Sequence, residues 1–95
     1  MAQREIVVEL DICKEAEEDG WLVRKLQYVG RRGAPDRMFV KGGRVVFIEF
    51  KKLGENPDGL QQREHDRLRG RGITVYVVRK HDEARKILGL GIYSA

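Results

Sequence analysis

The chain has 95 residues, of which 36% are charged and 41% hydrophobic, with a formal net charge of +4. This length predicts one domain, residues 1–95, with a small core, and the basic balance is compatible with a polyanionic partner. The single cysteine excludes a disulfide framework and a cysteine-rich zinc site, and the absence of a signal peptide or an apolar run of roughly 20 residues predicts a cytoplasmic protein, in a bacterium or a virus-infected cell.

Residues 4–19 are predicted to form a helix. Its apolar residues recur at spacings of three or four along one side: Ile6, Leu10, Cys13 and Ala16. The opposite side carries Asp11, Lys14, Glu15 and Glu18. Glu9 departs from this division, because at 100° per residue it lies inside the apolar arc. It either reaches water or a basic partner from the edge of that arc, or it belongs to a functional site.

Residues 21–29 are predicted to form a strand, with Lys25 on the same face as Trp21 and Val23. Lys25 either approaches a substrate phosphate or is a solvated strand residue. The loop that follows, Gly30-Arg31-Arg32-Gly33, is basic and bracketed by glycines. Its two arginines could clamp a phosphate, since guanidinium groups bind phosphate in a bidentate manner, or form a solvated turn.

A β-hairpin is predicted where residues 36–41 and 44–51 flank Gly42-Gly43, because a two-residue turn needs the positive φ that glycine adopts freely. If Lys41 pairs with Arg44, the facing pairs are Val40 with Val45, Met38 with Phe47, and Asp36 with Glu49. One face of the hairpin then carries Asp36, Met38, Val40, Val45, Phe47, Glu49 and Lys51.

This register places the carboxylates of Asp36 and Glu49 opposite each other on an otherwise apolar face. Two like charges so placed repel each other. A hard divalent cation such as Mg²⁺, which prefers oxygen ligands, would remove that repulsion. The alternative is an exposed strand end with Asp36 in a turn. The apolar residues around Glu49 favour a site, because an unpaired buried charge is costly.

Residues 52–59 are rich in turn formers and precede a predicted helix at residues 60–71. Its inward side would carry Gln61, His65 and Leu68, with Gly72 beyond, and His65 could be merely a packed polar residue. Its outer face is basic, either a track for a DNA backbone or a solvated surface: Arg63, Arg67, Arg69 and Arg71.

Residues 73–78 form a β-branched run typical of a strand buried on both faces. The helix at residues 60–71 would therefore be a crossover that returns the chain to the sheet. Residues 81–88 are predicted to form a short closing helix, and residues 89–95 a tail.

The residues of the hairpin also carry a resemblance to a known family. Pro35-Asp36 followed by Glu49-Phe50-Lys51 resembles the metal site of the PD-(D/E)XK nuclease superfamily. The segment 31–37, the Gly-Gly hairpin, and Leu60-Gln61 with Leu68 and Gly72 resemble the VRR-NUC domain in its small stand-alone form, from about residue 9 to about residue 78. The resemblance implies an α/β fold with a restriction-endonuclease-like α-β-β-β-α-β core and a mixed central sheet flanked by helices.

The resemblance also implies roles for particular residues. The metal would be held by Asp36, Glu49 and the carbonyl of Phe50, with Glu9 completing the cluster and Glu5 as the fallback. Lys51 would act on the attacking water, and Gln61, rather than Gln62, would orient that lysine or the phosphate. Contacts to nucleic acid would come from Lys25, Arg31, Arg32, Arg63 and Arg67.

The function expected from these features is an endodeoxyribonuclease that depends on Mg²⁺, with Mn²⁺ able to substitute. Small stand-alone members of the family are associated with homodimers and with cleavage of branched DNA such as four-way (Holliday) junctions. Two alternatives stay open. One is a restriction-like or mismatch endonuclease acting on ordinary duplex, and the other is a non-catalytic DNA-binding module on the same fold.

Overall fold

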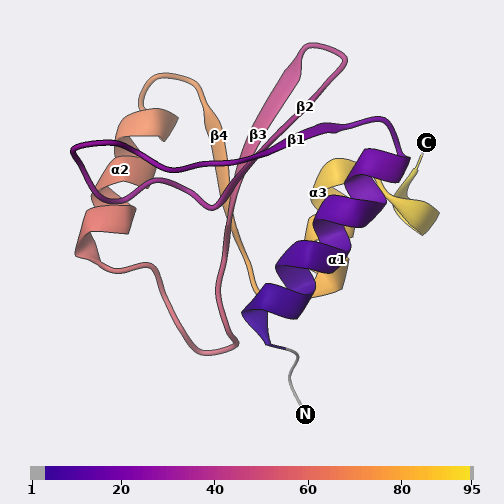
Figure 1. Ribbon diagram of the computed structural model, residues 1–95, viewed down its shortest axis with the longest axis horizontal. Coiled ribbons are helices and arrows are strands. Elements are labelled where there is room, and N and C mark those ends of the chain that lie inside the picture. Colours follow the sequence, from indigo (N-terminus) through magenta and orange to yellow (C-terminus); the bar gives the residue numbers. More distant parts are fainter. Residues whose placement is uncertain (1–3, 95) are drawn as a thin grey trace.

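The β-hairpin around Gly42 and Gly43 lies at the centre of a four-stranded sheet in the computed structural model, which describes residues 4–94 (Figure 1). In chain order the elements are α1 (Glu5–Glu18), β1 (Leu22–Lys25), β2 (Arg37–Lys41), β3 (Arg44–Phe50), α2 (Gly59–Arg69), β4 (Thr74–Val78), α3 (His81–Leu88) and the 3-10 turn η1 (Gly91–Tyr93). The strands lie in the order β1-β2-β3-β4. The predicted mixed sheet flanked by helices is confirmed, and η1 is an addition to it.

The hairpin register is the one that the Gly-Gly turn predicts. Both glycines adopt positive φ, +57° and +79°, and the paired residues are Lys41 with Arg44, Val40 with Val45, and Met38 with Phe47. The ladder ends at Arg37 and Ile48, so the predicted pairing of Asp36 with Glu49 inside the ladder is wrong. Asp36 instead lies just before β2 and accepts a hydrogen bond from the backbone N–H of Phe50 at 2.8 Å.

The crossover predicted from the helix at residues 60–71 is confirmed. Strand β4 runs parallel to β3, whereas the β1–β2 and β2–β3 pairs are antiparallel. Helix α2 packs against β4, and α1 and α3 pack against each other and against the sheet (Figure 1). The main core lies between the sheet and these two helices, and it includes Ile12, Phe39, Val46, Ile48 and Phe50.

The buried face of helix α1 overlaps the predicted one, because Cys13 and Ala16 are buried as predicted, but it is shifted toward Val8 and Ile12. Ile6 and Leu10 are 46% and 54% exposed, whereas Val8 and Ile12 are buried in the core. The helix has apolar residues on two arcs that share Cys13 and Ala16, and the buried arc is the one that extends to Val8 and Ile12. Periodicity alone cannot choose between the two arcs, because both recur at helical spacing.

Strands β1 and β4 also differ from prediction. The strand predicted at residues 21–29 ends at Lys25, opposite Arg37 where β2 begins, and Val29 is 98% exposed. Within residues 4–94 no strand continues β2 before Arg37, so after the hydrogen bond from the Leu26 N–H to the Asp36 carbonyl the backbone leaves the sheet as a loop. Strand β4 was predicted to be buried on both faces, but it is an edge strand on which Thr74 and Tyr76 are exposed.

The later helices lie close to their predicted positions. Helix α2 begins one residue early and ends two residues early, and α3 has the predicted bounds. Within residues 4–94, no helix has both the length and the apolar character needed to cross a membrane.

Candidate active site

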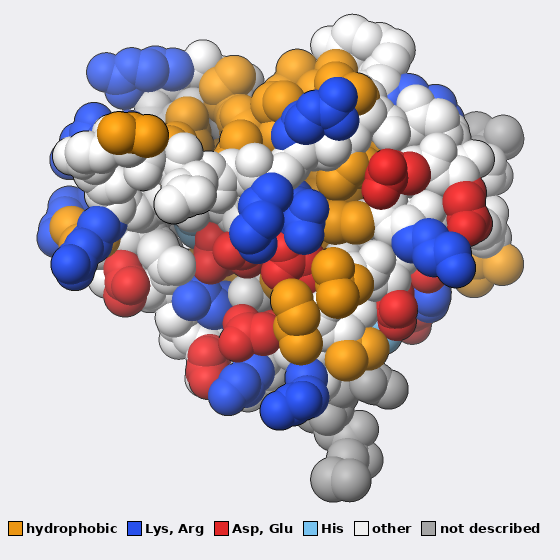
Figure 2. Space-filling model, in the orientation of Figure 1, with side chains coloured by type: hydrophobic (Ala, Val, Ile, Leu, Met, Phe, Trp, Pro, Cys, Tyr) orange, Lys and Arg blue, Asp and Glu red, His pale blue; other side chains and the backbone are white. Residues whose placement is uncertain are grey.

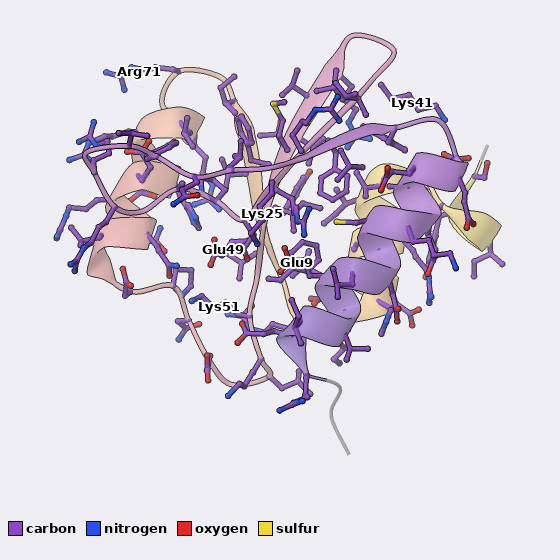
Figure 3. All side chains as sticks on the ribbon, viewed as in Figure 1. Glu9, Lys25, Lys41, Glu49, Lys51 and Arg71 are labelled. Carbon is purple, nitrogen blue, oxygen red and sulfur yellow. The ribbon has the colours of Figure 1, made fainter. Side chains whose placement is uncertain are left out.

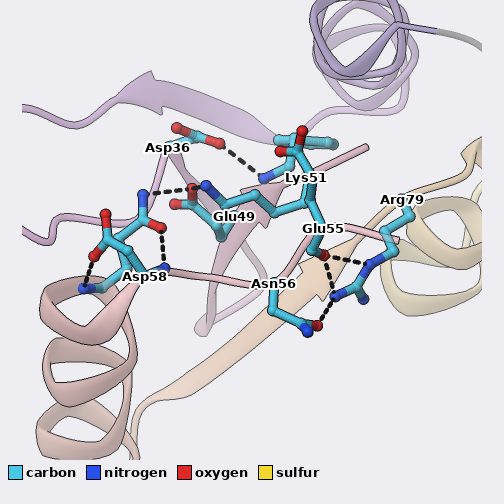
Figure 4. Close-up of polar contacts among 9 residues, drawn as sticks. Asp36, Glu49, Lys51, Glu55, Asn56, Asp58 and Arg79 are labelled. Atoms are coloured by element: carbon cyan, nitrogen blue, oxygen red, sulfur yellow. Dashed lines mark hydrogen bonds and ion pairs between the residues drawn. The ribbon is translucent and has the colours of Figure 1, made fainter. Parts of the chain in front are cut away.

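Glu49 is the centre of the polar cluster at the end of β3 (Figures 3 and 4). Its side chain is buried, and its Oε2 accepts a hydrogen bond from Gln61 Nε2 at 3.0 Å and lies 3.6 Å from Lys51 Nζ. Its Oε1 is buried without a hydrogen-bond partner within residues 4–94. Burial, and then the charge of Asp36, raise the pKa of Glu49 to about 7. The carboxylate is therefore costly to ionise in the protein alone.

Asp36 lies next to Glu49 because of the hydrogen bond from the Phe50 N–H, which ties the residue before β2 to the end of β3. Burial raises the pKa of Asp36, and the Phe50 N–H opposes this shift by stabilising the carboxylate. The charges of Asp36 and Glu9 both raise the pKa of Glu49. The structure thus brings the two predicted carboxylates together through a backbone contact and not through the predicted ladder pair.

Glu9 is buried, as its place inside the apolar arc predicts, and one of its carboxylate oxygens has two basic partners. Arg37 Nε donates to Glu9 Oε2 at 2.6 Å, and Lys25 Nζ lies 3.5 Å from the same oxygen. The part of the chain that the structure describes contains no group of three or more histidine, cysteine or acidic residues arranged to hold a metal. Metal binding by Glu9, as by Asp36 and Glu49, therefore stays a prediction. Glu5, the fallback, is only partly buried.

The pair Asp36 and Glu49 fits a hard divalent cation. Such ions take carboxylate and carbonyl oxygens, and among the described residues the buried Oε1 of Glu49 has no hydrogen-bond partner. An unsatisfied buried acceptor is costly to a protein unless it serves a ligand or water. The resemblance implies the carbonyl of Phe50 as a third ligand. Phe50 follows Glu49 and precedes Lys51 in the chain, and its side chain is in the core.

The two consecutive lysines after β3 point in different directions. The Lys51 side chain is 17% exposed and lies against Glu49, whereas the Lys52 side chain is 59% exposed and pairs with Glu55 at 3.6 Å. This difference follows from the alternation of side chains along a strand. Lys51 therefore joins the acidic cluster, and Lys52 does not.

Gln61 connects helix α2 to the cluster. Asp58 and Gln61 form a capping box, in which each side chain accepts a hydrogen bond from the other residue's backbone N–H, at 2.9 and 3.0 Å. The amide nitrogen of Gln61 remains free to donate to Glu49. Gln61 thus orients the Glu49 carboxylate, and the role that the resemblance implies for it, orienting Lys51 or the phosphate, stays a prediction. Gln62 bonds to Asp66 on the exposed side of α2.

The predicted nucleic-acid contacts lie on exposed surfaces. Lys25, Arg31, Arg32, Arg63 and Arg67 are all exposed. Figure 2 shows lysine and arginine side chains gathered over α2 and the adjoining loop, and Figure 3 places Lys25 between Glu9 and Glu49. Arg67 also lies 3.4 Å from Glu64.

Sequence reasoning missed three residues that shape this region. Asp58 is the N-cap of α2, and the spacing Asp-x-x-Gln of a capping box could have found it. Arg37, which holds Glu9, and Tyr28, which donates to Glu64 at 2.8 Å, have no local signal, because their partners lie 28 and 36 residues away.

His65 lies one turn after Gln61 on the inward side of α2, as predicted. It is fully buried, and neither ring nitrogen has a hydrogen-bond partner in the described part of the chain. Burial, and then the charge of Arg69, lower its pKa. The lowered pKa favours the neutral imidazole at neutral pH.

No family model matches the chain. The chain is 38% identical over 80 residues to "Putative nuclease p44" of Acyrthosiphon pisum secondary endosymbiont phage 1, a match that covers 83% of this chain and 86% of that relative. It is also similar to a solved structure described as "VRR_NUC domain", with 39% identity and a TM-score of 0.83 over 92% of this chain and 96% of the other.

Proposed function

Because the chain belongs to the VRR-NUC family of nucleases, we propose that it is a divalent-cation-dependent endodeoxyribonuclease that acts on branched DNA. The observation that carries this proposal is the state of Glu49. One of its oxygens is held by Gln61 and Lys51, and the other is buried without a hydrogen-bond partner in the part of the chain that the structure describes. A carboxylate held in this way is preorganised for a ligand that is not protein.

Each residue of the cluster has a role in the proposed reaction. Asp36, Glu49 and the Phe50 carbonyl would hold Mg²⁺ or Mn²⁺, which when bound supplies Lewis-acid polarisation of the phosphate and acidifies water. Gln61 keeps the Glu49 carboxylate in one orientation. Lys51 offers an ammonium group that can hold the attacking water and offset negative charge on the phosphate. Glu9, held by Arg37 and Lys25, adds negative charge to the site. The expected products have 5′-phosphate and 3′-hydroxyl ends.

DNA cleavage by the purified protein, with and without Mg²⁺, tests this proposal. Four-way junctions and linear duplexes of matched sequence are the substrates, and we expect cleavage only with the cation and faster on the junction. Equal rates on both substrates would instead favour the restriction-like or mismatch endonuclease. Binding without cleavage under any divalent cation would favour the non-catalytic DNA-binding module.

We also propose that the protein is a homodimer, since a four-way junction has near two-fold symmetry and two copies would present one site to each of two strands. An apolar surface supports this proposal. We define the open sheet face as the partly or fully exposed side chains of Leu22, Met38, Val40, Val45 and Phe47, which are neighbours through the β1–β2 and β2–β3 registers. Figure 2 shows hydrophobic side chains gathered in this region. Contiguous exposed apolar surfaces of this kind commonly mark interfaces.

Sedimentation of two charge variants tests the dimer. Val45→Glu places a carboxylate on the open sheet face, and it is expected to convert a wild-type dimer to a monomer at micromolar concentration. Leu53→Glu is the matched control, because Leu53 is also an exposed apolar residue but lies in the loop after β3. A monomeric wild type, or loss of the dimer in both variants, would contradict this interface.

A further inference from the structure

The β1–β2 loop, residues 26–36, meets helix α2 at two places. Near its start, the Tyr28 hydroxyl donates to Glu64 Oε2 at 2.8 Å. Near its end, Gly33 passes so close to α2 that a Cβ there would lie 2.7 Å from the Leu60 carbonyl oxygen and 3.2 Å from Glu64 Cβ. Figure 1 shows the loop lying across α2. The two arginines, Arg31 and Arg32, lie between these two attachment points and are exposed.

The contact between Tyr28 and Glu64 joins a phenol donor to a carboxylate acceptor. Glu64 is buried although it is acidic, and Arg67 lies 3.4 Å from its other oxygen. The hydrogen bond from Tyr28 is the main cause that lowers the pKa of Glu64, so the carboxylate stays ionised and remains an acceptor. Burial, and then Glu64, raise the pKa of Tyr28 to about 12, so the phenol stays protonated and remains a donor.

The base of the loop is also joined to the polar cluster around Glu49, through Asp36. The Leu26 N–H donates to the Asp36 carbonyl oxygen at 3.0 Å, which closes the two ends of the loop on each other. Helix α2 is tied to the same cluster through the hydrogen bond from Gln61 to Glu49. A loop fixed to α2 therefore holds Arg31 and Arg32 at a set distance from the carboxylates of Asp36 and Glu49. In a detached loop these arginines would sample many positions, and DNA binding would then carry the entropic cost of ordering them.

We propose that Tyr28, Glu64 and Gly33 are positioning residues that lock the β1–β2 loop onto α2, so that Arg31 and Arg32 bind the DNA backbone together with the arginines of α2 as one surface. This inference rests on the proposed function, since it assumes a DNA substrate. Phosphate contacts of this kind fix the orientation of a nucleic acid without reading its sequence. The lock therefore acts on substrate binding, and the carboxylates and Lys51 act on the chemical step.

Tyr28→Phe is the decisive variant, because it removes the donor without changing net charge. We expect it to weaken binding of a labelled junction in EDTA by about tenfold, with a shallower dependence on salt, since each phosphate contact contributes a slope of roughly 0.9. With Mg²⁺ the KM should rise by a similar factor while kcat stays within about twofold. Tyr76→Phe, which removes a hydroxyl from exposed Tyr76 on β4, is the matched control.

A double-mutant cycle separates positioning from a general effect on the fold. If Tyr28 acts through the loop arginines, adding Tyr28→Phe to Arg31→Ala/Arg32→Ala should weaken binding no further. Gly33→Ala, which pushes the loop against the Leu60 carbonyl, should reproduce the loss and the same dependence on those arginines. Undiminished binding by Tyr28→Phe, or an equal loss in the background lacking both arginines, would overturn the lock. A wild type that binds no DNA would instead refute the proposed function and the lock together.

Discussion

Replacing Glu49 with glutamine is expected to abolish DNA cleavage and to stabilise the metal-free protein at neutral and alkaline pH. Glutamine is nearly isosteric and can still accept the hydrogen bond from Gln61, so the fold is retained. It lacks the charge needed to hold a divalent cation with Asp36. Cleavage should fall by at least about a thousandfold, which corresponds to roughly 4 kcal/mol of activation free energy. Asp36→Asn should have the same effect on cleavage.

The stability effect depends on pH in a defined direction. Burial and Asp36 raise the pKa of Glu49 from 4.5 to about 7, so the folded protein binds this proton more tightly than the unfolded chain. Glu49 therefore does not reduce the free energy of unfolding of the wild type below pH 4.5, but reduces it progressively as the pH rises toward 7. Above pH 7 the full penalty applies, and Glu49→Gln should raise the free energy of unfolding by about 2–3 kcal/mol.

Urea unfolding in EDTA at pH 4.5 and pH 8 measures this difference. Glu49→Gln should exceed the wild type at pH 8 and match it at pH 4.5. Glu55→Gln is the matched control, because Glu55 is exposed in the loop that follows β3. Full cleavage by Glu49→Gln would refute the assignment of Glu49 as a metal ligand. A variant less stable than the wild type at pH 8 would refute the claim that the buried, ionised Glu49 destabilises the metal-free protein.

Replacing Lys51 with alanine is expected to lower kcat by about 10²–10⁴-fold while DNA binding is preserved, as is typical when a group acts on proton transfer or transition-state charge. Lys51 is the ammonium that lies against Glu49, and its positive charge lowers the pKa of that carboxyl against the effect of burial. In the proposed reaction this ammonium holds the attacking water and offsets negative charge on the phosphate. Single-turnover cleavage and binding in EDTA together separate chemistry from affinity.

Lys52→Ala is the matched control for Lys51, since it removes the same group one residue further along the chain. Lys52 pairs with Glu55 on the other side of the backbone, so this variant should keep most of its turnover. If Lys52→Ala is the inactive variant and Lys51→Ala is not, the chemistry takes place on the face of β3 opposite to the one proposed here.

The amino-acid sequence by itself determined the centre of this protein. Gly42-Gly43 favours a tight two-residue turn, and the alternation of side chains then places Glu49 and Lys51 on the same side of the chain at the end of β3. The β-branched run at residues 73–78 and the helical spacing before it determined the parallel crossover. These features depend on local backbone geometry and on periods of 2 and 3.6 residues, which can be read from neighbouring residues.

Only the tertiary structure decided which arc of α1 enters the core, where β1 ends, and which partners the buried charges take. Two arcs of α1 are apolar, and packing against the sheet selected the one with Val8 and Ile12. Strand β1 ends where its partner strand begins. Glu9 with Arg37 and Tyr28 with Glu64 are contacts across 28 and 36 residues. Such pairs depend on how complete elements pack, because no local spacing brings their side chains together.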